Sequence, residues 1–189
     1  MGDPRKIRRK FSRPLQPWRT DRITSENKLV KEYGLKNKRE IWKAQSMLTA
    51  FTNKAKDLVA ATGKQADTER VQLMTRLARI GLVQSGGGLD DVLGLNLQNI
   101  LNRRLQTMVL KKGLAKTPTQ ARQFIVHEHI TIGNKKITAP SYIVNVSEEP
   151  HLAFVSTSVL TNAAHPARQT KTDAAQADTT PKPAQKGVA

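Results

Sequence analysis

The sequence predicts an α+β fold, with a helical N-terminal region, a small module of two helices packed on a short-stranded sheet, and a disordered C-terminal tail. Apolar residues recur at helical spacing through the first hundred positions, whereas β-type alternation starts only near residue 130. Large aliphatic side chains nearly vanish after residue 160. We therefore divide the chain into a basic arm (1–23), a helical domain (24–98), the module (99–155) and a flexible tail (156–189).

Charge separates two basic zones from a neutral middle. Of the 189 residues, 32 are Lys or Arg and 15 are Asp or Glu, a net charge of +17 that makes a polyanion the leading partner. Residues 1–50 carry 14 basic and 5 acidic residues, and residues 101–150 carry 8 and 3. The fifty residues between them carry 6 and 5. Two basic surfaces are therefore expected, joined by a nearly neutral helical core.

Composition also excludes several classes of protein. The chain has no cysteine, which excludes disulfides, a thiol nucleophile and every Cys-based zinc site. Hydrophobic residues make up 38% and aromatic residues 4%, so a large enzyme with an enclosed pocket is disfavoured. No apolar run approaches the ~18 residues that a membrane span needs. We expect a cytoplasmic protein with no membrane partner.

The arm is too dense in positive charge to fold alone, because like charges repel and little apolar area is available for burial. One interpretation is a solubilising disordered arm. We favour an arm that orders against phosphates, with Phe11 and Trp18 as flat surfaces for bases or sugars. Its predicted RNA contacts are Arg5, Lys6, Arg8, Arg9 and Lys10.

Capping residues and glycines predict three helices in the helical domain, over 25–33, over 37–63 and from Asp67 or Thr68 to residue 81. Gly34 suits the left-handed turn that ends the first helix, and Gly81 stops the third. Apolar residues at helical spacing mark the buried faces, namely Ile41, Leu48, Phe51, Ala55, Leu58 and Val59 in the second helix and Val71, Met74, Leu77 and Ala78 in the third.

A glycine run at 86–88 follows Ser85, but no Gly-Lys-Ser or Gly-Lys-Thr comes after it, so a connector is preferred to a phosphate-binding loop. One helical turn is predicted at 89–94. Asp90 and Asp91 lie at its start, where negative charge stabilises a helix N-terminus. Capping is therefore preferred to a metal site or an acid-base site.

Two helices open the module. The stripe of Leu101, Leu105, Met108 and Val109 predicts the first, which ends at Gly113. Its phase places four cations on an outward face: Arg103, Arg104, Lys111 and Lys112.

The second helix starts at Thr117, because Thr is a good cap, Pro118 suits the first helical position and Gln120 follows three residues after the cap. Residues 130–132 then alternate toward a turn at Gly133-Asn134, and residues 142–146 are predicted to return as a strand.

Several motifs occur in a recognisable order. Within the module they are Arg104-Leu105-Gln106-Thr107-Met108-Val109, Lys112-Gly113-Leu114-Ala115-Lys116-Thr117, Gln120-Ala121-Arg122-Gln123, His127-Glu128-His129-Ile130 and Ala139-Pro140-Ser141-Tyr142-Ile143-Val144. This part resembles the RNA-binding domain of the S-four family of small-subunit ribosomal proteins. The segments 17–18, 32–38 and 89–95 are similar to the archaeal and eukaryotic form of that family. The chain departs from the pattern at Glu128, where many relatives have a small or basic residue.

The resemblance implies a primary binder of small-subunit ribosomal RNA that engages a multi-helix junction early in assembly. It also implies a contribution to translational accuracy near the region where messenger RNA enters the subunit. Neighbouring small-subunit proteins and messenger RNA are the implied further partners. The N-terminal zinc motif of some bacterial relatives is missing, and we expect no metal, no cofactor and no enzymatic activity.

The residue types suit such a role, because a rigid helical pair can offer cations to phosphates and polar groups to ribose or base edges. Arg is favoured since its planar fork holds phosphate through two hydrogen bonds. The predicted contacts of the module are Arg103, Arg104, Lys112, Lys116, Arg122, Lys135 and Lys136 for phosphates, and Thr117, Gln120, Gln123, His127 and Asn134 for ribose or bases.

Three alternatives are weaker. A zincin-type metal site needs a second His three residues after the Glu, but Thr131 stands there. An RNA-modifying enzyme or ribosome-associated factor would carry the same module, yet no glycine-rich cofactor fingerprint precedes it, and Arg76-Leu77 is followed by Ala78 rather than a catalytic Asp. A helix-turn-helix regulator would want a dimer interface and a second DNA-reading surface.

Overall fold

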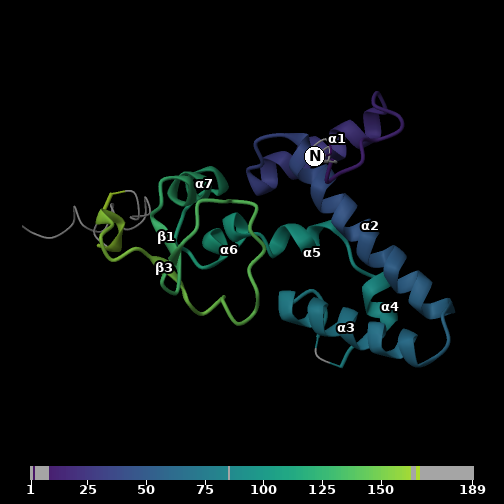
Figure 1. Ribbon diagram of the computed structural model, residues 1–189. Coiled ribbons are helices and arrows are strands. Elements are labelled where there is room, and N and C mark those ends of the chain that lie inside the picture. Colours follow the sequence, from purple (N-terminus) through teal and green to yellow (C-terminus); the bar gives the residue numbers. More distant parts are fainter. Residues whose placement is uncertain (1, 3–8, 85, 163–164, 167–189) are drawn as a thin grey trace, which may run out of the picture.

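The computed structural model describes residues 2, 9–84, 86–162 and 165–166. Seven α-helices, three strands and one 3-10 helix follow one another in this part of the chain (Figure 1). They are α1 (Thr20–Tyr33), α2 (Lys38–Ala60), α3 (Lys64–Ile80), α4 (Leu89–Leu93), α5 (Leu97–Asn102), α6 (Leu105–Lys111), α7 (Pro118–Val126), β1 (Ile130–Ile132), β2 (Lys135–Lys136), β3 (Leu152–Phe154) and η1 (Val159–Thr161).

The helix α2 is the central helix of the N-terminal region. It contacts α1, α3, α4 and α5, and α5 leads from it into the module (Figure 1). The buried side of α2 consists of Ile41, Ala44, Leu48, Phe51, Ala55 and Leu58, and these side chains share one apolar cluster with the neighbouring helices. The predicted stripe is therefore largely confirmed, because residues three and four apart lie on one side of a helix.

Two residues that were predicted to lie on buried helix faces are exposed instead. Val59 is 56% exposed and Val71 is 66% exposed. Each residue turns an α-helix by about 100°, so Val71 lies on the far side of α3 from Leu73, two residues along. Leu73 and Leu77 define the buried side instead. Val71 is apolar, but its position in the helical repeat places it outside this buried side.

Helix starts were predicted less well than helix ends. Gly34 adopts the left-handed conformation after α1, as predicted, and Gly81 ends α3 as predicted, also in the left-handed conformation. However, α1 begins at Thr20, so Ser25 is an interior residue whose hydroxyl donates to the carbonyl of Arg22. Likewise α3 begins at Lys64, and Gly63, with a φ of 117°, directly precedes it. Asn37 does precede α2, and Asp91 accepts from the backbone N–H of Gly88 at the start of α4.

The sheet of the module is three-stranded and antiparallel, with β1 in the middle. Thr131 pairs with Lys136 of β2 and with Ala153 of β3. The β1–β2 hairpin matches the predicted turn. The predicted strand at 142–146 is wrong, since this segment makes only an isolated bridge from Ile143 to Arg104. Its backbone is used elsewhere, because Leu105 N–H donates to Tyr142 O at 2.7 Å.

A second apolar cluster fills the module. It contains Leu105, Met108, Val109, Phe124, Ile125, Ile130, Val144, Leu152 and Leu160. Two helices on a small antiparallel sheet, after a helical N-terminal region, confirm the predicted fold class. The predicted tail begins too early, because Leu160 is buried in this cluster and η1 holds it there. Residues 167–189 of the predicted tail lie outside the described residues.

Candidate nucleic-acid interface

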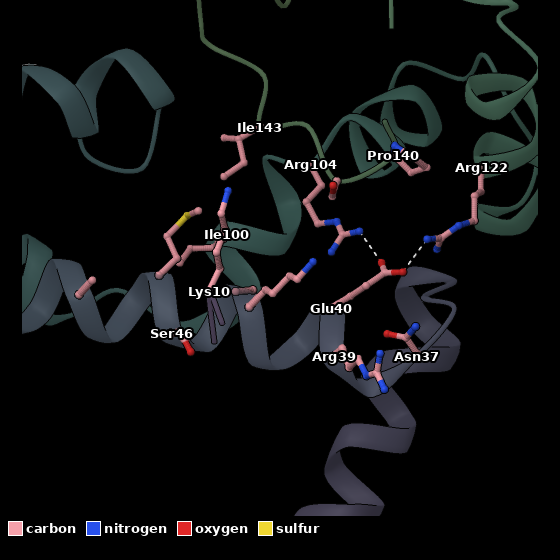
Figure 2. A pocket seen from close by; sticks show the side chains of 15 residues that line it. Lys10, Asn37, Arg39, Glu40, Ser46, Ile100, Arg104, Arg122, Pro140 and Ile143 are labelled. Atoms are coloured by element: carbon pink, nitrogen blue, oxygen red, sulfur yellow. Dashed lines mark hydrogen bonds and ion pairs between the residues drawn. The ribbon is translucent and has the colours of Figure 1, made fainter. Parts of the chain in front are cut away.

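One carboxylate joins the helical region to the module. Glu40, in the first turn of α2, accepts from Arg104 at Oε2 and from Arg122 at Oε1, both at 2.5 Å (Figure 2). The side chains of Glu40 and Arg104 are 15% and 6% exposed. We call Glu40, Arg104, Gln106 and Arg122 the junction cluster.

Gln106 extends the junction cluster to the loop between α1 and α2. Its amide nitrogen donates to the carbonyls of Tyr33, Gly34 and Pro118, at 3.2, 3.0 and 2.8 Å. Its amide oxygen accepts from Arg122 at 3.3 Å. The side chain is 1% exposed, so all of its hydrogen bonding is satisfied inside the protein. Sequence reasoning missed both Glu40 and Gln106, although a Gln directly after Leu105 in a largely apolar helix was a signal of an unusual buried group.

Arg103 and Arg104 were predicted to lie on an outward face of the helix. Arg104 is buried instead, and Arg103 is largely buried. The predicted single helix breaks between α5 and α6, where Arg104 bridges to Ile143. This break changes the helical phase and turns Arg104 inward. The side chain of Arg103 is 14% exposed and binds Glu149 at 3.0 Å and the carbonyl of Val144 at 2.9 Å. Both guanidinium groups hold the protein together in this structure.

Burial and charge act in opposite directions on Glu40. Burial alone raises the pKa of Glu40, but the hydrogen bonds and charges of Arg122 and Arg104 outweigh it and hold that pKa below its usual value. Burial lowers the pKa of Arg104, and the charge of Glu40 opposes this shift. The carboxylate is therefore ionised near neutral pH and compensates two cations.

The N-terminal end of α7 uses three predicted RNA contacts for its own structure. Thr117 caps the helix through the backbone N–H of Gln120, and Gln120 in turn accepts from the backbone N–H of Lys116 at 2.8 Å. The ammonium of Lys116 donates to the carbonyl of Pro166 at 3.3 Å. This end of α7 is thus pre-organised, with its cap made as predicted.

The other predicted contacts lie at the outer surface of the module. Gln123 is exposed on α7, and His127, the residue directly after this helix, is exposed at a spacing of four, so the two share one face. Asn134, Lys135 and Lys136 are exposed on the β1–β2 hairpin. The hairpin lies near the end of α7, because the ammonium of Lys136 is 3.8 Å from the carboxylate of Glu128. Lys112 is also exposed, and it donates to the carbonyl of Glu149.

Glu128 occupies a conformation that favours a smaller residue. Its φ is 62°, the one positive φ outside glycine among the described residues. A left-handed conformation places Cβ close to the following carbonyl oxygen and costs roughly 1–2 kcal/mol, although Asn tolerates it.

We expect Glu128→Asn to raise the free energy of unfolding by about 0.5–1 kcal/mol through relief of this strain. Glu128→Ala is the matched control, since it also removes the exposed carboxylate but lacks the short polar side chain with which Asn hydrogen-bonds locally in the left-handed region. Urea denaturation of the three proteins measures the difference. Equal midpoints for the Asn and Ala variants would contradict strain at this residue.

Only part of the predicted arm can be placed. Arg5, Lys6 and Arg8 lie outside the described residues, whereas Arg9 and Lys10 are exposed. The arm reaches α2, because Ser12 N–H donates to Ser46 Oγ at 3.1 Å and the Phe11 ring lies 6.1 Å from that of Trp42.

The two predicted flat surfaces differ in their surroundings. Phe11 packs against Trp42, whose indole N–H donates to the buried Glu26 at 3.0 Å. Trp18 is 87% exposed and remains accessible for a base.

The motif at 127–129 brings two imidazoles near each other. The rings of His127 and His129 are 6.4 Å apart, and His129 Nδ1 is 3.0 Å from the hydroxyl of Ser158. Among the described residues, no group of three or more His, Cys, Asp or Glu side chains is arranged to hold a metal ion. In the same part of the chain, every helix is too short or too polar to span a bilayer.

Comparison with known proteins assigns the family. The S4 domain model matches residues 103–149. The small ribosomal subunit protein uS4 of Methanococcus aeolicus is 48% identical over 169 residues, 89% of this chain and 96% of the relative. The uS4 proteins of Methanococcus maripaludis and Methanothermobacter thermautotrophicus are 44% and 45% identical, over 91% and 84% of this chain and 97% and 92% of the relatives.

These relatives are ribosomal proteins matched along nearly their whole length, so the alternative of an RNA-modifying enzyme is wrong. The chain belongs to the uS4 family of small ribosomal subunit proteins, and it is a non-enzymatic structural protein with an S4 domain.

Proposed function

We propose that this chain binds small-subunit ribosomal RNA in the cytoplasmic ribosome, helps to nucleate assembly of the subunit and supports translational accuracy. Its proposed position is near the region where messenger RNA enters, beside neighbouring small-subunit proteins. The S4 domain is the observation that carries the proposal. The net charge of +17 and the exposed Lys135 and Lys136 support it, since phosphate contacts supply most nonspecific RNA affinity.

The exposed part of the interface consists of the α7 face and the β1–β2 hairpin, and the arm forms a second part. In this proposal Gln123, His127 and Asn134 contact ribose or base edges beside the hairpin lysines. Arg104 and Arg122 act indirectly, by holding α7 in place through Glu40. The junction cluster thus positions the surface that meets RNA.

We expect the purified chain to bind small-subunit ribosomal RNA far more tightly than duplex DNA at the same salt concentration. Replacing Lys135 and Lys136 together with Gln is expected to lower the salt dependence of RNA affinity, log K against log salt, by about 1–2. Filter binding over a salt series measures both quantities.

The matched control replaces Lys54 and Lys56 with Gln, which removes two charges from exposed positions of α2 outside the proposed interface. An equal loss in this control would show that only net charge matters. Equal affinity for ribosomal RNA and duplex DNA would contradict the proposal itself. Co-sedimentation with the small subunit after a high-salt wash tests the ribosomal location independently.

A further inference from the structure

A groove of about 690 Å³ lies between α2 and the segment that leads from β2 to the module core (Figure 2). Its apolar lining comes from three separate parts of the chain. Ala44, Met47 and Ala50 line it from α2, Ile100 from α5, and Pro140 and Ile143 from the opposite side. Met47 is 36% exposed and Ala50 is also exposed, so the apolar surface is open to a ligand.

Cations border this apolar surface. Lys10, Arg39 and Lys43 line the groove and are exposed. None of the three forms an ion pair with another described residue. Lys10 is brought there by the contact of Ser12 with Ser46 on α2. Figure 2 shows Lys10 and Arg39 along α2, with Glu40 pointing away from them to Arg104 and Arg122.

The charge of the groove is therefore one-sided. Its single carboxylate, Glu40, is already bound by two guanidinium groups, and the three unpaired cations have no acidic partner in the lining. Asn37 lies at the same end, and its side chain makes no capping hydrogen bond at the start of α2. An amide that can donate and accept thus lies beside an apolar surface and a set of phosphate-binding groups.

This combination matches the chemistry of a nucleotide taken out of its stack. A base has two apolar faces, hydrogen-bonding edges and a phosphate on each side, whereas the bases of a continuous duplex are covered by their neighbours. We propose that the groove holds one unstacked nucleotide of the RNA, with its base against Met47 and Ala50 and its phosphates near Lys43 and Lys10. This inference rests on the RNA binding proposed above.

The test compares two RNA hairpins at fixed salt. One carries a single bulged 2-aminopurine, and the other has the same stem without a bulge. We expect the full chain to bind the bulged hairpin about tenfold more tightly, because burial of one base against apolar side chains adds to the phosphate contacts that both hairpins offer. The fluorescence of 2-aminopurine is also expected to change on binding, because the base leaves water for an apolar groove.

Ala50→Glu is the decisive variant, because it places a carboxylate in the groove beside the predicted phosphate positions. Ala60→Glu is its control, with the same change of charge at an exposed position of α2 outside the groove. We expect Ala50→Glu to abolish the tenfold preference and Ala60→Glu to keep it. Circular dichroism melting checks that both variants are folded.

The outcomes separate this inference from the proposed function. Equal, tight binding of both hairpins by the unmodified chain overturns the nucleotide site and leaves RNA binding intact. Failure to bind either hairpin or ribosomal RNA overturns the proposed function. If Ala50→Glu keeps the bulge preference but loses binding of a synthetic peptide of alternating Glu and Leu, the groove is a protein docking site and the inference is wrong.

Discussion

Replacing Glu40 with Gln is expected to lower the free energy of unfolding by about 3–5 kcal/mol, because Arg104 then stays buried without a counter-charge. The amide has nearly the shape of the carboxylate, so the loss reports on charge more than on packing. For a chain of this size the melting temperature is expected to fall by on the order of 10 °C. Thermal and urea denaturation measure both quantities.

Glu32→Gln is the matched control, since Glu32 is exposed on α1 and forms no ion pair with a described residue. It is expected to change stability by less than about 0.5 kcal/mol. Arg104→Met is expected to destabilise less than Glu40→Gln, because Glu40 keeps Arg122 as a partner. In the Glu40→Gln background, Arg104→Met is expected to recover part of the loss by removing the unpaired charge. A Glu40→Gln loss no larger than that of Glu32→Gln would contradict the junction cluster.

The pH dependence of stability gives a second test of Glu40. Its folded-state pKa lies below the unfolded value of about 4.5, so its contribution is fully present above that value and is lost as the pH falls through the folded pKa. Between neutral pH and the acid range, the unmodified chain is therefore expected to lose more stability than Glu40→Gln. Parallel curves for the two proteins would show that Glu40 is not specifically stabilised in its charged form.

Features that depend on a few neighbouring residues could be predicted from the sequence. The left-handed turns at Gly34 and Gly81 and the cap at Thr117 with Pro118 follow from local backbone chemistry. The apolar stripe of α2 also follows from local periodicity. These signals were sufficient for the fold class, because it depends mainly on the type and order of the elements.

The junction cluster could not be predicted, because it depends on contacts between distant parts of the chain. Glu40 and Arg104 are 64 residues apart, and Gln106 meets the carbonyl of Tyr33 across 73 residues. The break at Arg104 exists because its backbone bridges to Ile143. Helical periodicity alone extended one helix through this point and so placed Arg104 outside.

The missed strand has a similar cause. β3 is three residues long and pairs with β1 across about 20 positions, so Leu152 has little local signal. The stronger apolar run at 142–146 was preferred, but its backbone meets the break between α5 and α6. Which segment pairs with β1 depends on how different parts of the chain compete for the same backbone hydrogen-bonding groups. This competition cannot be seen in a single sequence.

Replacing Gly34 with Ala is expected to lower the free energy of unfolding by about 2–4 kcal/mol, since it combines backbone strain with a steric clash. The φ of Gly34 is 59°, and a left-handed Ala costs roughly 1–2 kcal/mol. A Cβ at this position would lie 2.6 Å from Pro118 Cβ and 3.1 Å from the amide nitrogen of Gln106. Overpacking of this kind typically adds 1–3 kcal/mol.

Gly113→Ala isolates the strain from the clash. Gly113 has a φ of 70°, but a Cβ there would have no neighbour within 4 Å, so only the backbone cost applies. Urea denaturation should therefore show a larger loss for Gly34→Ala, and the difference measures how closely the loop after α1 packs on α7. Because Pro118 begins α7, the same clash displaces the helix that positions Gln123 and His127. RNA affinity, compared at matched folded fraction, should therefore fall more for Gly34→Ala than for Gly113→Ala. Equal losses of stability in the two variants would contradict close packing of this loop against α7.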